Sequence, residues 1–153
     1  MKMIRLVRAT SSRVFLIYPV LLVLVEWLLQ GPALRLQLAG LPLLAWGYLQ
    51  YRLSGRYRSR LGGGGPGLGK PPERIVSSGI YAYTRNPMYL GLLIFLAGLA
   101  VCLRSYLGLL LMLLHIPWFH RRVIGDEARL SELFGEEYSA YTRRVKRWIP
   151  GIA

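Results

Sequence analysis

The sequence contains few residues of the types that bind metals or form disulfides. Its 153 residues include one cysteine and two histidines. Cys102 lies in an apolar stretch and has no second cysteine to pair with, and a lone buried thiol is usually inert packing. His115 and His120 are five positions apart, which places them about 140° apart around a helix. We therefore expect no internal disulfide and no metal site.

Apolar residues, by contrast, are abundant and gather in long blocks. The chain is 54% hydrophobic with a mean hydropathy of +0.36, which is too apolar for an ordinary soluble domain of this length. A helix that crosses a bilayer needs about 20 mostly apolar residues, with about 17 as a working minimum. The blocks predict spans at about 14–30, 36–53, 87–103 and 105–120. We predict an all-α integral membrane protein with about four transmembrane helices.

The segments outside these blocks complete the predicted topology. Only Arg104-Ser105 separates the last two spans, which are short, so we expect them to form a tight hairpin. A glycine-rich cytoplasmic linker is predicted at 54–76 and a cytoplasmic tail at 121–153, where an amphipathic helix is expected. The whole chain, 1–153, is predicted to be a single domain.

Basic residues outnumber acidic ones, and their positions orient the chain. Twenty Lys and Arg against seven Asp and Glu give a formal net charge of +13. All but Arg35 and Arg104 lie before the first block, between the second and third, or after the last. This is the positive-inside bias of a four-span protein with both termini in the cytoplasm, and it argues against nucleic acid as a partner. Glu26, an acid inside the first block, is expected to pair with Arg35 or to be partly exposed.

The linker contains a stretch that matches phosphate-binding loops only formally. Residues 61–72 read LGGGGPGLGKPP. Phosphate loops need a strand before the glycines and a helix after them. No strand precedes this stretch, and Pro71-Pro72 prevents a helix. We interpret it as a flexible linker or lid.

A polar threshold precedes the third apolar block. Residues 79–91 read GIYAYTRNPMYLG. Asn86 and Pro87 predict a helix start, since asparagine caps exposed N–H groups and proline fits the first helical position. Arg85 has two interpretations: a headgroup anchor, or a bidentate partner for an anion that the helix N-terminus also attracts. The residues alone favour neither.

The tail carries an apolar stripe with an acid beside it. The stripe recurs at steps of three and four residues, as in an amphipathic helix; its members are Leu130, Phe134, Tyr138, Tyr141 and Val145. Gly135 is a helix-breaking residue type inside this stretch. Glu127 lies on or near the same face, and an inward-facing acid needs a partner. That partner is either one of the many arginines or the ammonium group of a ligand.

Together the two segments SGIYAYTRNPMYLG and DEARLSELFGEEYSAYTRRVKRWIP carry a resemblance. They resemble the two signature blocks of the isoprenylcysteine carboxyl methyltransferase family and its phospholipid methyltransferase relatives. The similarity covers about 75–150 and marks a short, bacterial-type member. Asn86 stands where the prenylcysteine enzymes commonly have histidine, and Asp126 replaces the first glutamate of the acidic block.

The resemblance implies S-adenosylmethionine as methyl donor at the cytoplasmic face of a membrane, expected to be a bacterial inner membrane, and a lipophilic acceptor that enters from the bilayer. Arg85 and Glu127 are the predicted catalytic residues, holding the donor's carboxylate and ammonium respectively. The predicted donor-binding residues are Tyr81, Tyr83, Arg85, Asn86, Tyr89, Gly91, Asp126, Glu127, Tyr138 and Tyr141. The acceptor (carboxylate, thiol, hydroxyl or amine) and the oligomeric state stay open.

Two other functions fit the sequence less well. A membrane reductase of the steroid-reductase type would use NADPH, and the basic stretch 52–60 would bind its extra phosphates. A non-enzymatic membrane subunit would retain the fold without a donor. Donor binding distinguishes these from a methyltransferase.

Overall fold

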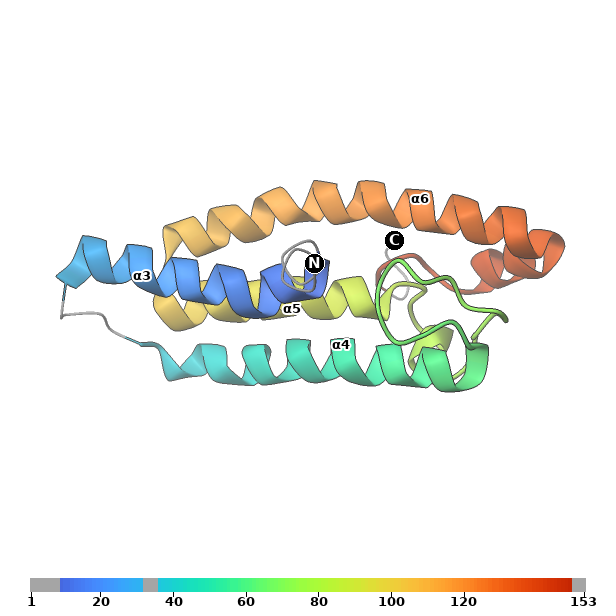
Figure 1. Cartoon of the computed structure of the whole chain (residues 1–153), viewed down its shortest axis with the longest axis horizontal. Helices are drawn as coiled ribbons and strands as arrows, with labels where there is room; N and C mark the ends of the chain where they lie inside the picture. Colours follow the sequence, from blue (N-terminus) through green and yellow to red (C-terminus); the bar gives the residue numbers. More distant parts are fainter. Residues whose placement is uncertain (1–8, 32–35, 150–153) are drawn as a thin grey trace, which may run out of the picture. The chain divides into compact units, whose positions relative to one another are not determined.

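The computed structural model describes residues 9–31 and 36–149, and all regular structure within these ranges is helical (Figure 1). The elements are α2 (Thr10–Ser12), η1 (Arg13–Ile17), α3 (Tyr18–Gln30), η3 (Leu38–Gly40), α4 (Leu41–Gly62), η4 (Gly79–Ala82), α5 (Pro87–Leu103) and α6 (Tyr106–Arg144). The prediction of an all-α chain is confirmed for these residues. The end of the predicted tail, 150–153, lies outside them.

The chain groups into two compact units, each made of two segments. Unit 1 combines Met1–Leu49 with Gly91–Ile116, and unit 2 combines Gln50–Leu90 with Pro117–Ala153. α4, α5 and α6 each contribute residues to both units. The single domain predicted from sequence stays a prediction.

In unit 1, α5 and α6 are joined by the turn that the sequence predicts. Arg104 takes a left-handed φ of 51° between the two helices. Ser105 caps α6, because its Oγ accepts the backbone N–H of Gly108 at 2.8 Å. Its hydroxyl donates in turn to Glu26, which also accepts the side-chain amide of Gln30 at 2.6 Å. Glu26 is therefore buried and paired within unit 1, so the expected partial exposure is wrong.

The other expected partner of Glu26, Arg35, lies outside the described residues. The hydrogen bonds of Glu26 explain why a buried acid is tolerated here: two donors satisfy the carboxylate, and it lies beside the positive end of α6.

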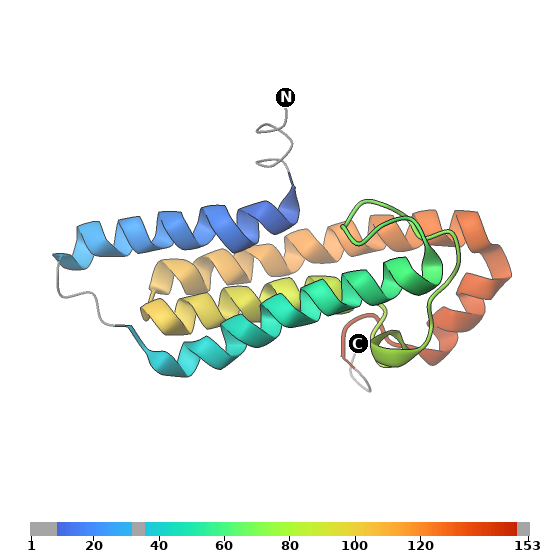
Figure 2. The same cartoon turned by 60° about the horizontal axis from the view of Figure 1, so that its bottom comes forward.

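Glycines let α4 and α5 approach closely in unit 1, where the two helices lie side by side in both views (Figure 2). A Cβ at Gly47 would lie 2.5 Å from the backbone nitrogen of Phe95, and one at Gly98 would lie 2.6 Å from that of Leu44. Backbone contact through small residues is the usual packing of helices in a membrane.

Two helical stretches are long and apolar enough to cross a membrane by length and composition. They are Thr10–Gln30 and Tyr106–Arg144, whereas the apolar helix Pro87–Leu103 is shorter. The first stretch leaves large apolar side chains uncovered, with Leu28 and Leu29 exposed by 73% and 69%. An apolar surface of this kind fits contact with lipid. The four predicted spans are thus supported for two helices.

Two helices extend beyond their predicted spans. α4 continues through the basic stretch to Gly62, so the glycine-rich segment begins later than the predicted 54. The arginines and Leu61 favour this extension, and Gly55 inside it is tolerated at a cost of about 1 kcal/mol. α6 joins the last predicted span to the amphipathic tail, and its helical path is interrupted at Gly135, where φ is 50° and ψ is −121°.

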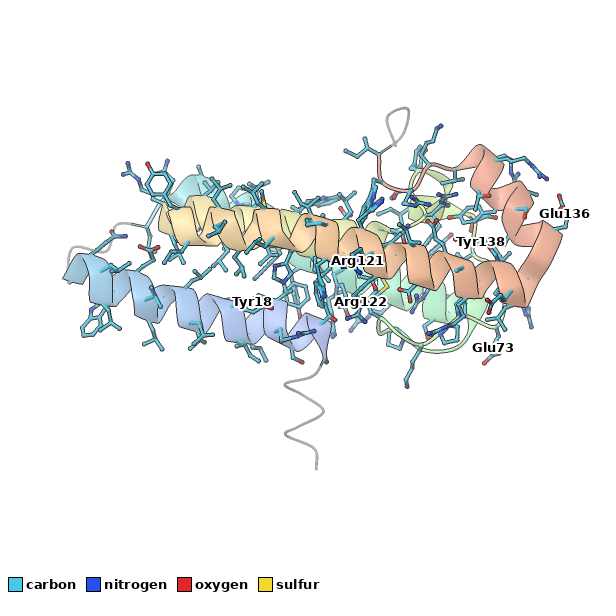
Figure 3. The ribbon with its side chains drawn as sticks, turned by 90° about the horizontal axis from the view of Figure 1, so that it is seen from above. Tyr18, Glu73, Arg121, Arg122, Glu136 and Tyr138 are labelled. Atoms are coloured by element: carbon cyan, nitrogen blue, oxygen red, sulfur yellow. The ribbon has the colours of Figure 1, made fainter. Side chains whose placement is uncertain are left out.

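Unit 2 is organised around the predicted stripe of the tail. Tyr138, Tyr141 and Val145 are buried together, and the partly buried apolar side chains that pack on them are Ile75, Leu130 and Phe134. Figure 3 shows Tyr138 on the inner side of this last helical segment and Glu136 on its outer side. The amphipathic prediction is confirmed, and the stripe positions Glu127 one turn before Leu130.

Candidate functional site

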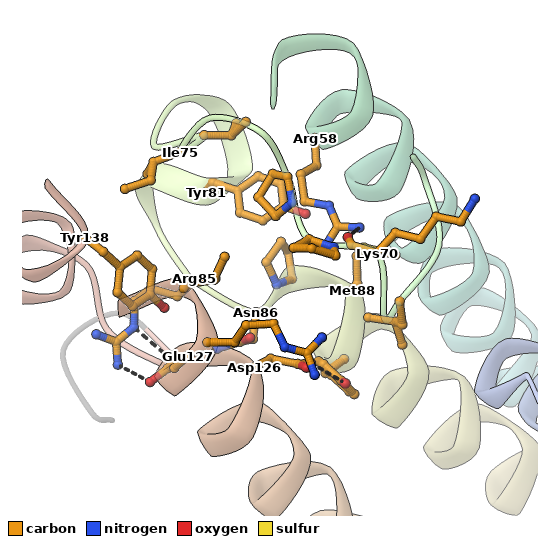
Figure 4. Close-up of a pocket in the computed structure, with 18 of the residues that line it drawn as sticks. Arg58, Lys70, Ile75, Tyr81, Arg85, Asn86, Met88, Asp126, Glu127 and Tyr138 are labelled. Carbon is orange, nitrogen blue, oxygen red and sulfur yellow. Dashed lines mark hydrogen bonds and ion pairs between the residues drawn. The ribbon is translucent and has the colours of Figure 1, made fainter. Parts of the chain in front are cut away.

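A pocket lies within unit 2, formed by the predicted threshold, the tail and the glycine-rich loop (Figure 4). Its empty volume is about 820 Å³, counted with the space open to solvent. The lining residues are Arg58, Leu68, Gly69, Lys70, Pro71, Pro72, Ile75, Val76, Tyr81, Arg85, Asn86, Pro87, Met88, Tyr89, Asp126, Glu127, Arg129, Leu130, Tyr138 and Tyr141.

Glu127 is the centre of a charged cluster at one wall of this pocket. Its Oε1 lies 3.2 Å from Nε of Arg85 and accepts Nδ2 of Asn86 at 3.1 Å. Its Oε2 accepts Nε of Arg147 at 3.0 Å and Nη2 of Arg85 at 3.4 Å, and lies 2.9 Å from Nη2 of Arg147. The side chains of Arg85 and Glu127 are each only 10% exposed. Of the two predicted partners for Glu127, the structure contains the arginine.

The segment after α6 is bound to the threshold through its backbone. Lys146 O accepts the backbone N–H of Arg85 at 3.0 Å. Arg147 O accepts Oγ1 of Thr84 at 3.2 Å and Nδ2 of Asn86 at 3.3 Å. These bonds hold the start of α5 and the end of the tail together independently of the arginine side chains.

Asn86 begins α5 as predicted, but its side chain has a different role. Its carbonyl oxygen accepts the N–H of Leu90, the first helical bond of α5, and its own N–H donates to Oγ1 of Thr84. Its side-chain amide donates to Glu127 and to the carbonyl of Arg147. Asn86 therefore links the threshold to the tail through its NH₂ group, whose bond to the carboxylate is charge-assisted.

The pocket tyrosines use their hydroxyls for internal hydrogen bonds. Tyr89 donates to Oδ2 of Asp126 at 2.8 Å, and Tyr141 donates to the carbonyl of Tyr81 at 2.7 Å. Tyr81 donates to the carbonyl of Ser54 at 3.3 Å, and burial raises its pKa to about 12. Tyr81 thus stays a neutral phenol at physiological pH, and these rings present apolar faces to the pocket.

The pocket brings together most of the predicted site residues. Those in its lining are Tyr81, Arg85, Asn86, Tyr89, Asp126, Glu127, Tyr138 and Tyr141. Tyr83 is not among them and is 67% exposed, because it lies beyond the short η4 turn that buries Tyr81. Gly91 is also absent from the lining: it belongs to unit 1, where its carbonyl lies against Gly47.

Sequence reasoning missed the contribution of Arg58 and of the loop. Nη2 of Arg58 donates to the carbonyls of Gly65, Gly67 and Lys70 at 3.2, 2.8 and 3.3 Å. Residues 68–72 of this loop line the pocket. The signal that could have found the loop was the glycine-rich stretch, which the sequence predicts as a linker or lid. Nothing in the sequence distinguishes Arg58 from the other arginines upstream of it.

The charges in the lining suit the binding of an anion. Four cations line the pocket with two anions: Arg58, Lys70, Arg85 and Arg129 against Asp126 and Glu127. Neither histidine nor cysteine is among the lining residues. An excess of positive charge beside aromatic and aliphatic walls suits a ligand with an anionic end and an extended apolar or aromatic part.

Comparison with known proteins agrees with the resemblance noted in the sequence. The family model described as phospholipid methyltransferase matches residues 37–137. Protein-S-isoprenylcysteine O-methyltransferase of Schizosaccharomyces pombe is 37% identical over 79 residues, which are 51% of this chain and 34% of that protein. The Mus musculus protein of the same name is 35% identical over 79 residues, 51% of this chain and 28% of its own.

A probable protein-S-isoprenylcysteine O-methyltransferase of Oryza sativa subsp. indica is 32% identical over 82 residues, 52% of this chain and 42% of its own. The chain thus matches less than half the length of these curated relatives. No solved structure matches. Since the family model covers most of the chain and includes both the threshold and the acidic block, the chain belongs to the phospholipid methyltransferase family and is related to the isoprenylcysteine O-methyltransferases.

Proposed function

We propose that the chain is a methyltransferase that uses S-adenosylmethionine to methylate a lipophilic acceptor at the cytoplasmic face of a membrane. The observation that carries this proposal is the convergence of the two signature segments on one pocket, whose lining holds Arg85, Asn86, Asp126 and Glu127. The family and its named relatives add methyl transfer as the reaction class.

The pocket offers complementary places for the two ends of the donor. Arg85 and the start of α5 provide positive charge for its carboxylate. Tyr81, Tyr138 and Tyr141 provide aromatic surface for its adenosine. The part of the wall formed by Ile75, Val76, Met88 and Leu130 is apolar and suits the acceptor.

The residues of the pocket fit a reaction that depends on alignment. The donor carries its methyl group on a positively charged sulfonium. The acceptor attacks the methyl carbon in line, and the donor's sulfur leaves as a neutral thioether. Such a step needs reacting atoms held in place and water kept out more than it needs an acid or a base. The loop residues 68–72 and the neutral tyrosines serve the exclusion of water, and the cluster around Glu127 fixes the direction of Arg85.

We further propose that the protein crosses the membrane four times, with both termini in the cytoplasm. The exposed apolar faces of α3 and α6 and the distribution of basic residues support this topology. Reporter fusions after Gly31 and at Arg104 are expected to be external, and fusions within 63–72 cytoplasmic. A cytoplasmic reporter at Arg104 would contradict the topology.

The deciding experiment is calorimetric binding of S-adenosylmethionine to the purified protein in bicelles. We expect micromolar binding, its loss in Arg85→Ala and its retention in Arg143→Ala, which removes only an exposed ion pair with Glu136. NADPH is titrated in parallel. Binding of NADPH without S-adenosylmethionine would indicate a reductase, and binding of neither by folded protein would indicate a non-enzymatic subunit.

A further inference from the structure

We infer that Arg147 is a positioning residue. Its guanidinium pairs with the carboxylate of Glu127, so that Glu127 orients Arg85 and does not bind the donor's ammonium. This inference rests on the proposed donor site and assigns a role to Arg147, which was not among the predicted site residues. It also replaces the ammonium role that the sequence predicts for Glu127.

The carboxylate of Glu127 is already paired with two guanidinium groups. Oε1 accepts Nδ2 of Asn86 and lies 3.2 Å from Nε of Arg85. Oε2 accepts Nε of Arg147 and the more distant Nη2 of Arg85, and lies 2.9 Å from Nη2 of Arg147. An ammonium ion arriving at Glu127 would have to share this carboxylate with both cations, beside a side chain that is 10% exposed, so a third cation is disfavoured there.

The net charge of the cluster also points away from an ammonium. Two guanidinium groups face one carboxylate, which leaves one unit of positive charge beside the pocket. Excess positive charge in a mostly buried site attracts an anion, here the donor's carboxylate. Without the side chain of Arg147 the cluster would be neutral, and Glu127 would compete with the ligand for Arg85.

Arg147 acts on the ligand only through Glu127 and Arg85. Arg85 and Glu127 line the pocket, but Arg147 does not. Its backbone carbonyl is held by Thr84 and Asn86 whatever its side chain. A substitution at Arg147 therefore removes the guanidinium that pairs with Glu127, while the backbone hydrogen bonds of this segment can still form.

The test compares two probes in the same bicelles: S-adenosylmethionine and its decarboxylated analogue, which lacks only the carboxylate. For Arg147→Ala we expect S-adenosylmethionine to bind about tenfold more weakly and the analogue to change less than about twofold. Arg147→Lys restores the charge with a single donor group and is expected to recover part of the loss. In a Glu127→Gln background, Arg147→Ala is expected to have no further effect, because its target is gone.

Arg143→Ala is the matched control, since Arg143 pairs with the exposed Glu136. An equal loss for both probes would show that Arg147 acts on the fold alone and would overturn the inference, as would unchanged binding of both. If Arg147→Ala does not fold, the comparison is made with Arg147→Lys against wild type. Wild-type protein that binds neither probe would instead overturn the proposed function itself.

Discussion

Replacing Glu127 by glutamine tests whether its charge holds unit 2 together. Glutamine keeps one oxygen, which can still accept Asn86, but it puts an NH₂ group where Oε2 now accepts the donors of Arg147. Breaking a buried pair by removing one partner costs about 3–5 kcal/mol. Because the Arg147 side chain is 32% exposed and water screens part of its charge, we expect a loss of about 2–3 kcal/mol from the free energy of unfolding.

A loss of this size corresponds to a fall in Tm of about 4–12 °C for a chain of this length. Thermal unfolding in detergent, followed by tryptophan fluorescence, measures it, since two of the four tryptophans, Trp118 and Trp148, belong to unit 2. Arg143→Ala breaks a pair whose side chains are 66% and 81% exposed, and should change the unfolding free energy by less than about 0.5 kcal/mol. Equal shifts for Glu127→Gln and Arg143→Ala would refute the argument that burial makes the Glu127 cluster important.

Three further tests, which use five substitutions, concern other parts of the chain. Arg58→Ala removes the donor that binds three loop carbonyls, so amide hydrogen exchange in residues 63–72 should accelerate about tenfold or more; unchanged exchange would show that the loop is held by other contacts. Gly47→Ala puts a Cβ against the backbone of α5 and should cost about 1–3 kcal/mol, whereas Gly125→Ala, with open space around it in α6, should stabilise by up to about 1 kcal/mol; the same sign for both in thermal unfolding would contradict the packing. Glu26→Ala leaves the donors of Gln30 and Ser105 without their acceptor and should cost about 1–3 kcal/mol more than Glu26→Gln; equal Tm values for the two variants would mean that these hydrogen bonds contribute little.

Periodicity predicted the parts of unit 2 that depend on local pattern. The apolar stripe of the tail forms the core of unit 2, and α5 starts at Asn86-Pro87. Both were predictable because spacing along a helix and backbone preference depend on residues that are close in sequence. The break at Gly135 follows from the same local rules, whereas Arg104 takes a left-handed φ that its residue type does not favour.

The partners of Glu127 depend on contacts that local rules do not describe. With 20 basic residues in the chain, charge alone cannot select Arg147 as the one that meets an acid 20 positions earlier. Burial of the tail stripe determines that choice. The same contact directs the NH₂ group of Asn86 to the carboxylate of Glu127, a long-range partner that the local cap pattern does not predict.

Arg58 was missed for a different reason. The apolar block predicts a second span that ends at about 53, but α4 continues to Gly62, because a helix ends where its backbone leaves helical geometry and not where its polarity changes. Gly63, with a φ of 73°, is the first residue after α4. Because α4 continues beyond the apolar block, Arg58 lies on this helix and reaches the carbonyls of the glycine-rich loop.

The bonds between Asn86 and Arg147 join positions 61 residues apart, which has a consequence for the order of synthesis. On the ribosome, Arg85 and the whole of α5 are made long before the segment that completes the cluster around Glu127. The pocket wall is therefore finished only when the last turn of α6 and the residues after it have emerged. A ligand of this pocket can stabilise the completed chain, but it has no complete site with which to guide the membrane insertion of the helices that precede it.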